Sequence, residues 1–455
     1  MRILLVVHQF LPKRAGGTEV LVRDTGLEML RQGHEVHVLT SDPDATGKSM
    51  GVSCEDYVYR GLEVHMLGVP RLGSPEGKIR DEYDNELVAE HVRRYVRGME
   101  LDVVHIFHLL RLSGSVVGVF RDLRVPVVFT PTDFWAICVR VTLTKPSGEL
   151  SSGPDDISAN CLECRGVERL LPPEELPDAS DKQAMYRNVA ERALAQSMDE
   201  HPGMVQVRAM LDRTRFLRES INAVDAILAP TELMRNTLIA NGIERGLISV
   251  SPYGMDISSF LRIRRSRSAS EKVRIGYIGA INPQKGLHVL IEAFKLLPRE
   301  AGATLRICGD LKTWPDYAQR VYAQAGDDDQ INFAGTFPNE RMADELAKID
   351  VLVVPSLWYE NAPLVIYSAI AAGIPVIASN HEGMAEIIDE KNGMLFAPGD
   401  PEDLTRQLKR LVVEPGFLAQ VGDVARKLRT VEDSVNEMLD LYESLRRGTS
   451  TLQSN

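Results

Sequence analysis

Short apolar runs alternate with amphipathic segments along most of the chain, a rhythm typical of a parallel sheet covered by helices. The clearest case is the uninterrupted apolar run from Val351 to Val354, which ends at Pro355-Ser356. A strand without polar–apolar alternation is buried on both of its faces. A helix is then expected to start at Pro363 and end at Gly373, before a strand at Val376 to Ala378. This stretch predicts one strand–helix–strand unit.

The second half of the chain repeats this pattern with little interruption. Strands are expected at residues 273–278, 304–308, 331–334, 351–354, 375–378 and 394–396. Helices are expected to start near Gly286, Asp316, Asn339, Pro363, Met384 and Pro401. Strands that alternate with helical crossovers in this way predict a doubly wound parallel sheet, and therefore the α/β class.

The first half has the same rhythm, but two segments interrupt it. Strands are expected at residues 2–7, 35–40, 62–66, 103–105, 125–129, 226–229 and 248–250, and helices at 18–32, 81–99, 208–223 and 231–240. Residues 42–59 are expected to leave the sheet as an excursion. From Cys138 to about Gln206 the strand–helix rhythm is lost, although Asp181 to Gln196 predicts a polar helix.

Length and composition indicate a globular protein of two domains. A chain of 455 residues is longer than a single hydrophobic core usually accommodates. Its composition, with 44% hydrophobic and 25% charged residues, is typical of globular proteins. The expected parts are a first domain at 1–261 with an insertion at about 136–207, a linker at 262–271, a second domain at 272–430 and a closing helix at 431–448. The formal charge of −12 argues against nucleic acid as a partner, because phosphate binding needs a basic face.

The sequence predicts a cytoplasmic protein without a transmembrane segment. Pro363, Gly373 and Pro375 interrupt its most apolar stretch, and the opening Met1 to Val7 is too short for a signal sequence. The linker at 262–271 contains four arginines. They predict a solvated hinge, with peripheral contact to a membrane surface as the alternative.

Three loops that follow expected strands carry candidate chemistry. Gly16-Gly17 and the loop from Gly279 to Lys285 each precede a helix, where glycine lets the backbone approach a phosphate closely. The third loop carries Glu360 and leads into a helix start whose amides would attract an anion. The alternatives are a plain tight turn for Gly16-Gly17 and an ordinary surface charge for Lys285.

The third loop carries a recognisable signature. The residues Pro355-Ser-x-x-Tyr-Glu360-Asn-x-Pro363-Leu, followed by Ala371-x-Gly373-x-Pro375-Val376, resemble the donor site of family 4 retaining glycosyltransferases of GT-B fold. The phrase Gly16-Gly17-Thr-Glu19 resembles the opening of the same family. The resemblance extends over most of the chain, and it implies two doubly wound Rossmann-like domains that face each other across a cleft.

The resemblance also implies roles for individual residues. Glu360 would touch the transferred sugar, Lys285 would bind the leaving diphosphate, and Asp133 would either orient an acceptor hydroxyl or cap the following helix. The implied donor-binding residues are Gly16, Gly17, Gly279, Lys285, Asn361, Ala362, Pro363, Leu364, Val365, Ser368 and Gly383. The chain departs from the family at Ser368, Ala280 and Thr132, where a glutamate, an arginine and a histidine are usual.

The implied function is metal-independent, retaining transfer of a sugar from a UDP-, GDP- or dTDP-linked donor to a glycan or lipid-linked glycan, as in polysaccharide or glycoconjugate synthesis. No cofactor is expected, because Lys285 and helix amides supply the donors for the leaving group. The three departures keep open a non-catalytic nucleotide-sugar-binding scaffold or partner subunit. Cys138, Cys161 and Cys164 could hold a structural zinc or remain reduced thiols in an acceptor-side insertion.

Overall fold

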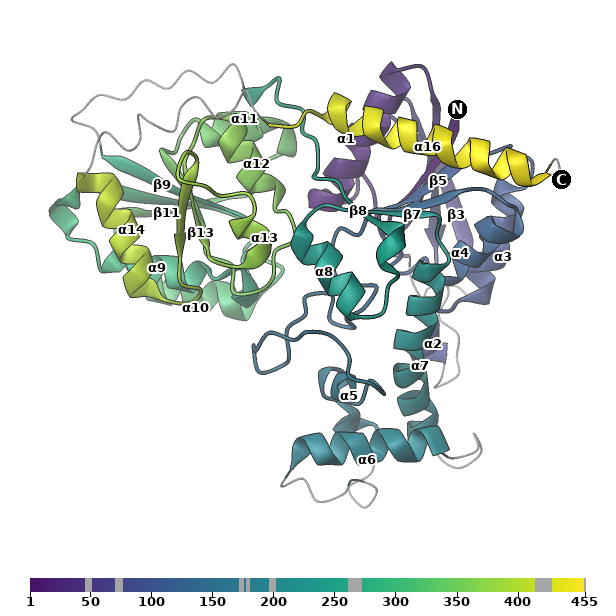
Figure 1. Ribbon diagram of the computed structural model, residues 1–455. Helices are drawn as coiled ribbons and strands as arrows, with labels where there is room; N and C mark the ends of the chain where they lie inside the picture. The colour runs from purple at the N-terminus through teal and green to yellow at the C-terminus, as the bar shows by residue number, and fades with distance from the viewer. Residues whose placement is uncertain are drawn as a thin grey trace. The chain divides into compact units, whose positions relative to one another are not determined.

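A computed structural model describes residues 1–45, 51–69, 77–171, 176, 181–195, 202–260, 272–413 and 428–453. Its chain divides into two compact units, Met1–Pro252 together with Val431–Asn455, and Tyr253–Thr430 (Figure 1). The expected linker at 262–271 lies outside the described residues. Among the described residues, no helix combines the length and the apolar character needed to cross a bilayer.

The first unit is built on a sheet with the strand order β3-β4-β2-β1-β5-β6-β7-β8. The strands are β1 (Arg2–Val6), β2 (Glu35–Ser41), β3 (Ser53–Tyr59), β4 (Leu62–Gly68), β5 (Val103–Ile106), β6 (Val127–Phe129), β7 (Ala226–Ala229) and β8 (Ile248–Val250). Neighbouring strands run parallel, except that β3 is antiparallel to β4. The prediction of an excursion is therefore wrong for residues 53–59, which form a largely exposed edge strand.

The helices expected in the first unit are present, although two of them start five or six residues away from the expected position. The helices of this unit are α1 (Gly17–Arg31), α2 (Gly77–Arg80), α3 (Glu86–Val96), α4 (Ser115–Asp122), α5 (Asn160–Arg165), α6 (Lys182–Ala195), α7 (Pro202–Asn222), α8 (Glu232–Ala240) and α16 (Val431–Gln453). Short 3₁₀ turns lie at Val167–Arg169 and Arg245–Leu247. The Thr231 side chain accepts a hydrogen bond from the Met234 amide, so it caps α8 as expected. The helices α2, α4 and α5 were not expected.

The closing helix α16 belongs to the first unit, where it packs along α1 (Figure 1). Arg446 pairs with Asp102 at 2.9 Å, and the Tyr442 hydroxyl hydrogen-bonds the ring of His105 on β5. Tyr442 and His105 are both fully buried. The helix continues to Gln453, past the expected end at residue 448.

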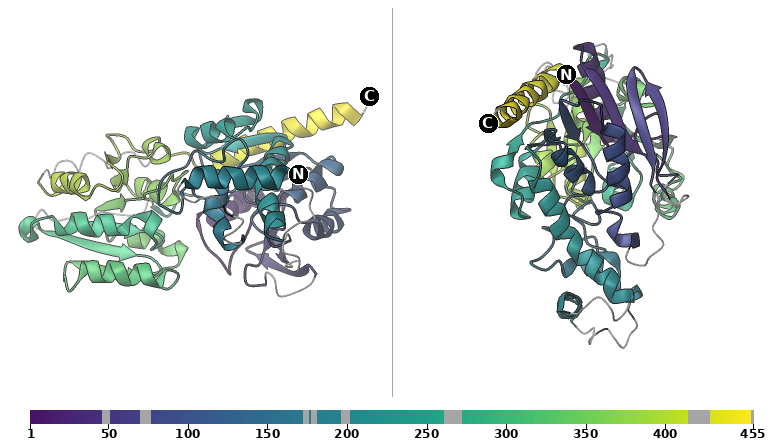
Figure 2. Two further views of the ribbon diagram at one scale, coloured as in Figure 1. Left: turned by 90° about the horizontal axis from the view of Figure 1, so that it is seen from below. Right: turned by 90° about the vertical axis from the view of Figure 1, so that its right-hand side faces the viewer.

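The insertion between β6 and β7 forms a helical extension of the first unit. The long helix α7 runs away from the sheet, α6 packs across its far part, and α5 contacts both (Figures 1 and 2). Where the strand–helix rhythm is lost, the described residues therefore include a separate group of packed helices.

The second unit is a parallel sheet with the strand order β11-β10-β9-β12-β13-β14. The strands are β9 (Val273–Ile278), β10 (Ala303–Cys308), β11 (Ile331–Gly335), β12 (Val351–Val354), β13 (Val376–Ser379) and β14 (Gly393–Phe396). In sequence order this arrangement is 3-2-1-4-5-6, the doubly wound order of dinucleotide-binding folds. The expected strands of this half are confirmed.

Helices cover both faces of the second sheet. They are α9 (Leu287–Lys295), α10 (Pro315–Ala325), α11 (Met342–Leu346), α12 (Leu364–Ala371), α13 (Glu382–Ala385) and α14 (Pro401–Val413), with 3₁₀ turns at Pro283–Lys285, Arg299–Ala301 and Asn339–Arg341. Val351 and Val353 pack into a core with α9, α10 and α14, whereas Leu352 and Val354 pack with α11 to α13. The predicted burial of β12 on both faces is confirmed.

Candidate functional site

The second unit places its candidate residues at the switch point of its sheet. The strands β9 and β12 are neighbours, with Ile275 opposite Val351, and their following connections lead to opposite sides of the strand order. Ligands of open α/β sheets bind beyond the carboxyl ends of two such strands, because the diverging connections leave a crevice there. The loops at 279–286 and 355–363 are the ones that follow β9 and β12.

These two loops are held together by backbone contacts. The Leu357 amide donates to the Gln284 carbonyl at 2.8 Å. Gly286 has a φ of +67°, and a Cβ at this position would lie 1.8 Å from the Pro355 carbonyl oxygen. Only glycine fits this left-handed backbone and close approach. The Asn282 side chain accepts from the Lys285 amide at 3.0 Å, which fixes the turn that carries Lys285.

Lys285 and Glu360 are in direct contact at this switch point. Lys285 Nζ lies 2.5 Å from Glu360 Oε1, and the same oxygen accepts from Ser356 Oγ at 2.6 Å and Trp358 Nε1 at 2.8 Å. The Lys285 ammonium also lies 5.2 Å from the centroid of the Trp358 ring. Glu360 is 6% exposed, so this carboxylate is oriented by three donors in a largely water-excluded place.

The first turn of α12 lies next in the chain after this contact. Pro363 precedes the helix and offers no capping side chain, while Leu364 and Val365 are half-buried, unlike the buried remainder of α12. Asn361 and Ala362 are buried just before it. The uncapped helix start with a partly open first turn has the geometry of an anion site.

Three further predicted donor-binding residues of the second unit, Ser368, Gly279 and Gly383, lie outside the contact between Lys285 and Glu360. The Ser368 hydroxyl donates to the Leu364 carbonyl at 2.9 Å and is buried inside α12. Gly279 follows β9 and is half-buried, and Ala280 is exposed. Gly383 is buried in α13.

His381 precedes α13, in the same turn as the predicted Gly383, but was not itself among the predicted donor-binding residues. Burial lowers its pKa, and its Nε2 has no hydrogen-bond partner among the described residues. Its ring makes an edge contact with Tyr359, at 5.8 Å between ring centroids. His381 therefore borders the Glu360 loop as a neutral imidazole.

The first unit has a second switch point, between β1 and β5. His8 follows β1 and His108 follows β5, and their ring centroids lie 4.2 Å apart. His108 Nε2 lies 2.7 Å from Asp133 Oδ2, and Asp133 Oδ1 accepts from the Trp135 amide at 2.9 Å. Asp133 thus caps a turn through one oxygen and pairs with a histidine through the other.

Sequence reasoning missed His8 and His108. The available signal was their position, since each comes within two residues of the end of a strand in this sheet. Burial, followed by the neighbouring His108 and Arg111, lowers the pKa of His8 well below 6.5. His8 is therefore neutral at pH 7.

The predicted glycines Gly16 and Gly17 are exposed at the start of α1. The Gly16 amide donates to Glu19 Oε2 at 2.5 Å, and burial raises the pKa of Glu19. The Thr18 hydroxyl donates to Thr132 Oγ1 at 3.0 Å. Thr132, which stands where the family has a histidine, therefore ties the α1 start to the loop that carries Asp133.

The three cysteines of the insertion region are not gathered as a ligand set. Among the described residues, the group of three whose ligand atoms all lie within 4.8 Å of one another does not include Cys138, Cys161 or Cys164. Burial raises the pKa of Cys161 to about 12 and that of Cys164 to about 11 in the metal-free chain. The structure thus gives the zinc alternative no support.

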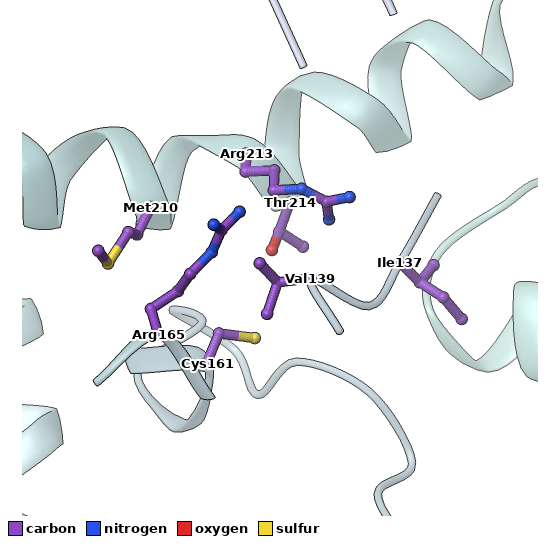
Figure 3. A pocket seen from close by; sticks show the side chains of 7 residues that line it. All are labelled: Ile137, Val139, Cys161, Arg165, Met210, Arg213 and Thr214. Carbon is purple, nitrogen blue, oxygen red and sulfur yellow. The ribbon is translucent and has the colours of Figure 1, made fainter. Parts of the chain in front are cut away.

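Cys161 instead lines a small pocket beside α7, together with Arg165 and Arg213 (Figure 3). The buried Arg213 donates to the Trp135 carbonyl at 2.5 Å, and its guanidinium lies 5.2 Å from the centroid of the Trp135 ring. The Trp135 ring is in turn 5.9 Å from that of His108. The insertion therefore supports the loop that carries Asp133.

Comparisons with known proteins agree with this architecture. Residues 16–179 match the family model "Glycosyl transferase 4-like domain", and residues 260–428 match "Glycosyl transferases group 1". The sulfoquinovosyl transferase of Arabidopsis thaliana is 30% identical over 49% of this chain and 44% of that protein. A D-inositol 3-phosphate glycosyltransferase of Corynebacterium efficiens is 26% identical over 85% of this chain and 80% of that protein. The chain spans about half the length of the first three curated relatives.

Solved structures share the fold. HepE of Anabaena in complex with UDP and glucose superposes with a TM-score of 0.63 at 16% identity, covering 98% of this chain and 100% of that one. Sucrose-phosphate synthase of Thermosynechococcus elongatus gives a TM-score of 0.66 at 18% identity, covering 98% and 99%. With a 4-like domain followed by a group 1 domain, the chain belongs to the family 4-like glycosyltransferases of GT-B fold.

Proposed function

We propose that this chain transfers a sugar from a nucleotide-linked donor to a glycan acceptor, with retention of the anomeric configuration. The observation that carries the proposal is the contact of Lys285 with Glu360 at the β9/β12 switch point, next in the chain to the uncapped start of α12. A cation, a helix start and an oriented carboxylate are the groups that a sugar diphosphate needs.

The reaction explains why these groups belong together. When the bond from the anomeric carbon to the diphosphate breaks, negative charge develops on the leaving oxygens and positive character on the sugar ring. The Lys285 ammonium keeps further N–H donors for phosphate oxygens beside its bond to Glu360. The amides of Ala362, Leu364 and Val365 would add to them, and Glu360 would bind the sugar hydroxyls. This donor set needs neither a divalent metal nor a cofactor.

The comparisons support a nucleotide-sugar donor and a glycan acceptor. HepE was solved with UDP-glucose, which favours UDP among the expected UDP-, GDP- and dTDP-linked donors. Relatives are named for amylovoran and colanic acid biosynthesis, which favours a polysaccharide or its lipid-linked precursor as acceptor. We assign the acceptor to the first unit, where Asp133 and His108 would orient its hydroxyl. A cytoplasmic location belongs to the same proposal.

For the chemical step we propose attack on the same face from which the diphosphate leaves. The leaving phosphate oxygen would take the proton of the acceptor hydroxyl as the new glycosidic bond forms. No side chain then has to form a covalent bond to the sugar, and the task of this chain is to place donors where charge develops.

Replacing Lys285 tests the proposal. Lys285→Ala should lower the turnover number about a hundred- to a thousand-fold, because a preorganised donor to the leaving group is lost. The matched control is Lys391→Ala, which removes the same charge from an exposed position of the second unit. Circular dichroism of both variants checks that the fold is intact. A loss of less than about threefold in the Lys285 variant, with the control unchanged, would exclude this role.

A second candidate function is nucleotide-sugar binding without turnover. It is favoured by the exposed Ala280 in place of the family's arginine and by the Ser368 hydroxyl, which is already bonded to Leu364. Calorimetry against a panel of nucleotides, followed by donor hydrolysis assays, separates the two functions. Binding without hydrolysis or transfer supports the second.

A further inference from the structure

A cluster of metal-binding side chains lies at the edge of the first sheet, on elements that carry none of the candidate donor or acceptor residues. It consists of Cys54 on β3, His65 on β4 and His91 on α3. One ligand atom from each of these residues lies within 4.8 Å of the other two. Nothing in the proposed glycosyl transfer uses them.

The strand register explains why these residues meet. Asp56 on β3 pairs directly with His65 on β4, and Cys54 lies two residues before Asp56 on the same face of the strand. The helix α3 then brings His91 to the same face. Three separate elements therefore converge, although the cysteine and the second histidine are far apart in sequence.

The two imidazoles are already oriented toward one another. His65 Nε2 and His91 Nε2 lie 3.0 Å apart, and His65 Nδ1 lies 2.5 Å from Asp56 Oδ1. The carboxylate favours the tautomer with a proton on Nδ1, which leaves the Nε2 lone pair available. The His65 ring is 5% exposed and stacks on Tyr95 with 3.8 Å between ring centroids, so it cannot turn freely.

We propose that Cys54, His65 and His91 bind one transition-metal ion, with zinc as the best chemical match. Imidazole nitrogen and thiolate sulfur are the ligands that zinc prefers, whereas calcium and magnesium prefer oxygen. A carboxylate on the second nitrogen of a ligating histidine is the usual outer support of such a site. Three protein ligands leave a fourth position for water, and binding releases the Cys54 thiol proton.

The ion would fix an edge strand that is otherwise paired on one side. The strand β3 also contacts the loop before α1, because the Tyr57 hydroxyl donates to the Leu11 carbonyl at 2.7 Å and Glu55 pairs with Lys13 at 3.1 Å. A metal that joins β3 to β4 and α3 therefore stabilises the first unit near that loop. The expected consequence is a higher melting temperature in the metal-bound protein.

Metal titration of the full chain tests the proposal without any sugar donor. Protein stripped with a chelator should bind one equivalent of Co²⁺, with the near-ultraviolet charge-transfer band of a thiolate ligand, and Zn²⁺ should displace it. Cys54→Ser should abolish that band, and Asp56→Asn should weaken Zn²⁺ binding about ten- to a hundred-fold. Cys54 is exposed, so its serine variant should fold normally.

The matched control is Cys164→Ser, which removes a thiol from the insertion and should leave metal binding unchanged. The proposal is overturned if the wild-type chain binds no Co²⁺ or Zn²⁺. It is also overturned if binding survives in Cys54→Ser, or disappears in the control. The His65–His91 contact would then be a hydrogen bond between imidazoles only. None of these outcomes depends on whether the chain transfers sugars.

Discussion

The two switch points of this molecule have the same topology but different chemistry. In the second unit the loops after β9 and β12 bring an ammonium and a carboxylate into contact, Lys285 with Glu360. In the first unit the loops after β1 and β5 bring together two imidazoles, His8 and His108. In our proposal the ammonium–carboxylate pair lies where the diphosphate would leave. The imidazoles, with His108 bonded to Asp133, lie where the acceptor hydroxyl would be held.

Burial accounts for much of this difference. Desolvation lowers the pKa of His8 and raises that of Glu19, so both groups shift toward their neutral forms. Glu360 is also buried, at 6% exposed, but three donors converge on one of its oxygens. The same doubly wound frame therefore holds an ammonium beside a carboxylate at one switch point, and two imidazoles beside the Asp133 carboxylate at the other.

The largest effect that distinguishes the two sites is expected from Asp133→Asn. Asparagine keeps an oxygen for the Trp135 amide but loses the charge that pairs with His108, at 2.7 Å from Asp133 Oδ2. Losing one charge-assisted hydrogen bond costs about 1.5–3 kcal/mol, or about ten- to a hundred-fold in kcat/KM for the acceptor. Initial rates at varied acceptor concentration measure this effect.

Nucleotide affinity should stay unchanged in the same variant, because the donor is assigned to the second unit. Asp122→Asn, which changes an exposed carboxylate of the first unit, is the control for loss of charge. If Asp133→Asn weakens nucleotide binding as much as it slows transfer, the division of donor and acceptor between the switch points is incorrect.

The sequence predicted the second unit more completely than the first. The apolar runs of its strands mark them clearly, because a parallel sheet covered by helices buries both faces of each strand. The strand Val351–Val354 shows this most clearly, because Val351 and Val353 pack in the core on one face of the sheet and Leu352 and Val354 pack in the core on the other face. The family resemblance implied that Lys285 and Glu360 serve one donor site, and the two residues, 75 positions apart in sequence, are in contact. Their roles in that site stay predictions.

The misses in the first unit have physical reasons. The strand β3 is an exposed edge with the sequence Ser-Cys-Glu-Asp-Tyr-Val-Tyr, so hydrophobic burial leaves little pattern in it. His108 becomes informative only beside Asp133, a contact that depends on the pairing of β5 with β6. The position of a histidine shortly after a strand does not identify its partner, and the separation of Cys54, His65 and His91 along the chain does not show that these residues meet.

A pH titration of stability probes the buried imidazoles of the first unit. Burial lowers the pKa of His105 to about 3, while the unfolded chain titrates near 6.5. Below about pH 6.5 the unfolded state therefore binds a proton that the folded state does not, and the free energy of unfolding should fall by about 1.4 kcal/mol per pH unit. His8 acts in the same direction, and the raised pKa of Glu19 opposes it.

Denaturant unfolding between pH 6.5 and about pH 5 measures this slope before most carboxylates titrate. Trp135 reports on the first unit alone when Trp314 and Trp358 are replaced by Phe, because both of these lie in the second unit. The His105→Gln variant, if folded, should show a shallower slope. A stability that is constant or rises on acidification over this range would contradict the buried neutral imidazoles.

The smallest effect is expected at Ser368, where the family has a ribose-binding glutamate. The Ser368 hydroxyl donates to the Leu364 carbonyl at 2.9 Å and is 5% exposed, so its donor is already used inside α12. Ser368→Ala should therefore change nucleotide affinity by less than about twofold, because a lost hydrogen bond between neutral groups costs about 0.5–1.5 kcal/mol, or about two- to tenfold. Calorimetry with UDP measures it, with Ser379→Ala as a control at a buried serine of β13. A tenfold loss of affinity in Ser368→Ala, with Ser379→Ala unchanged, would mean that the Ser368 hydroxyl leaves the Leu364 carbonyl and bonds the nucleotide instead. Ser368 would then serve as a nucleotide contact at the position where the family has a glutamate.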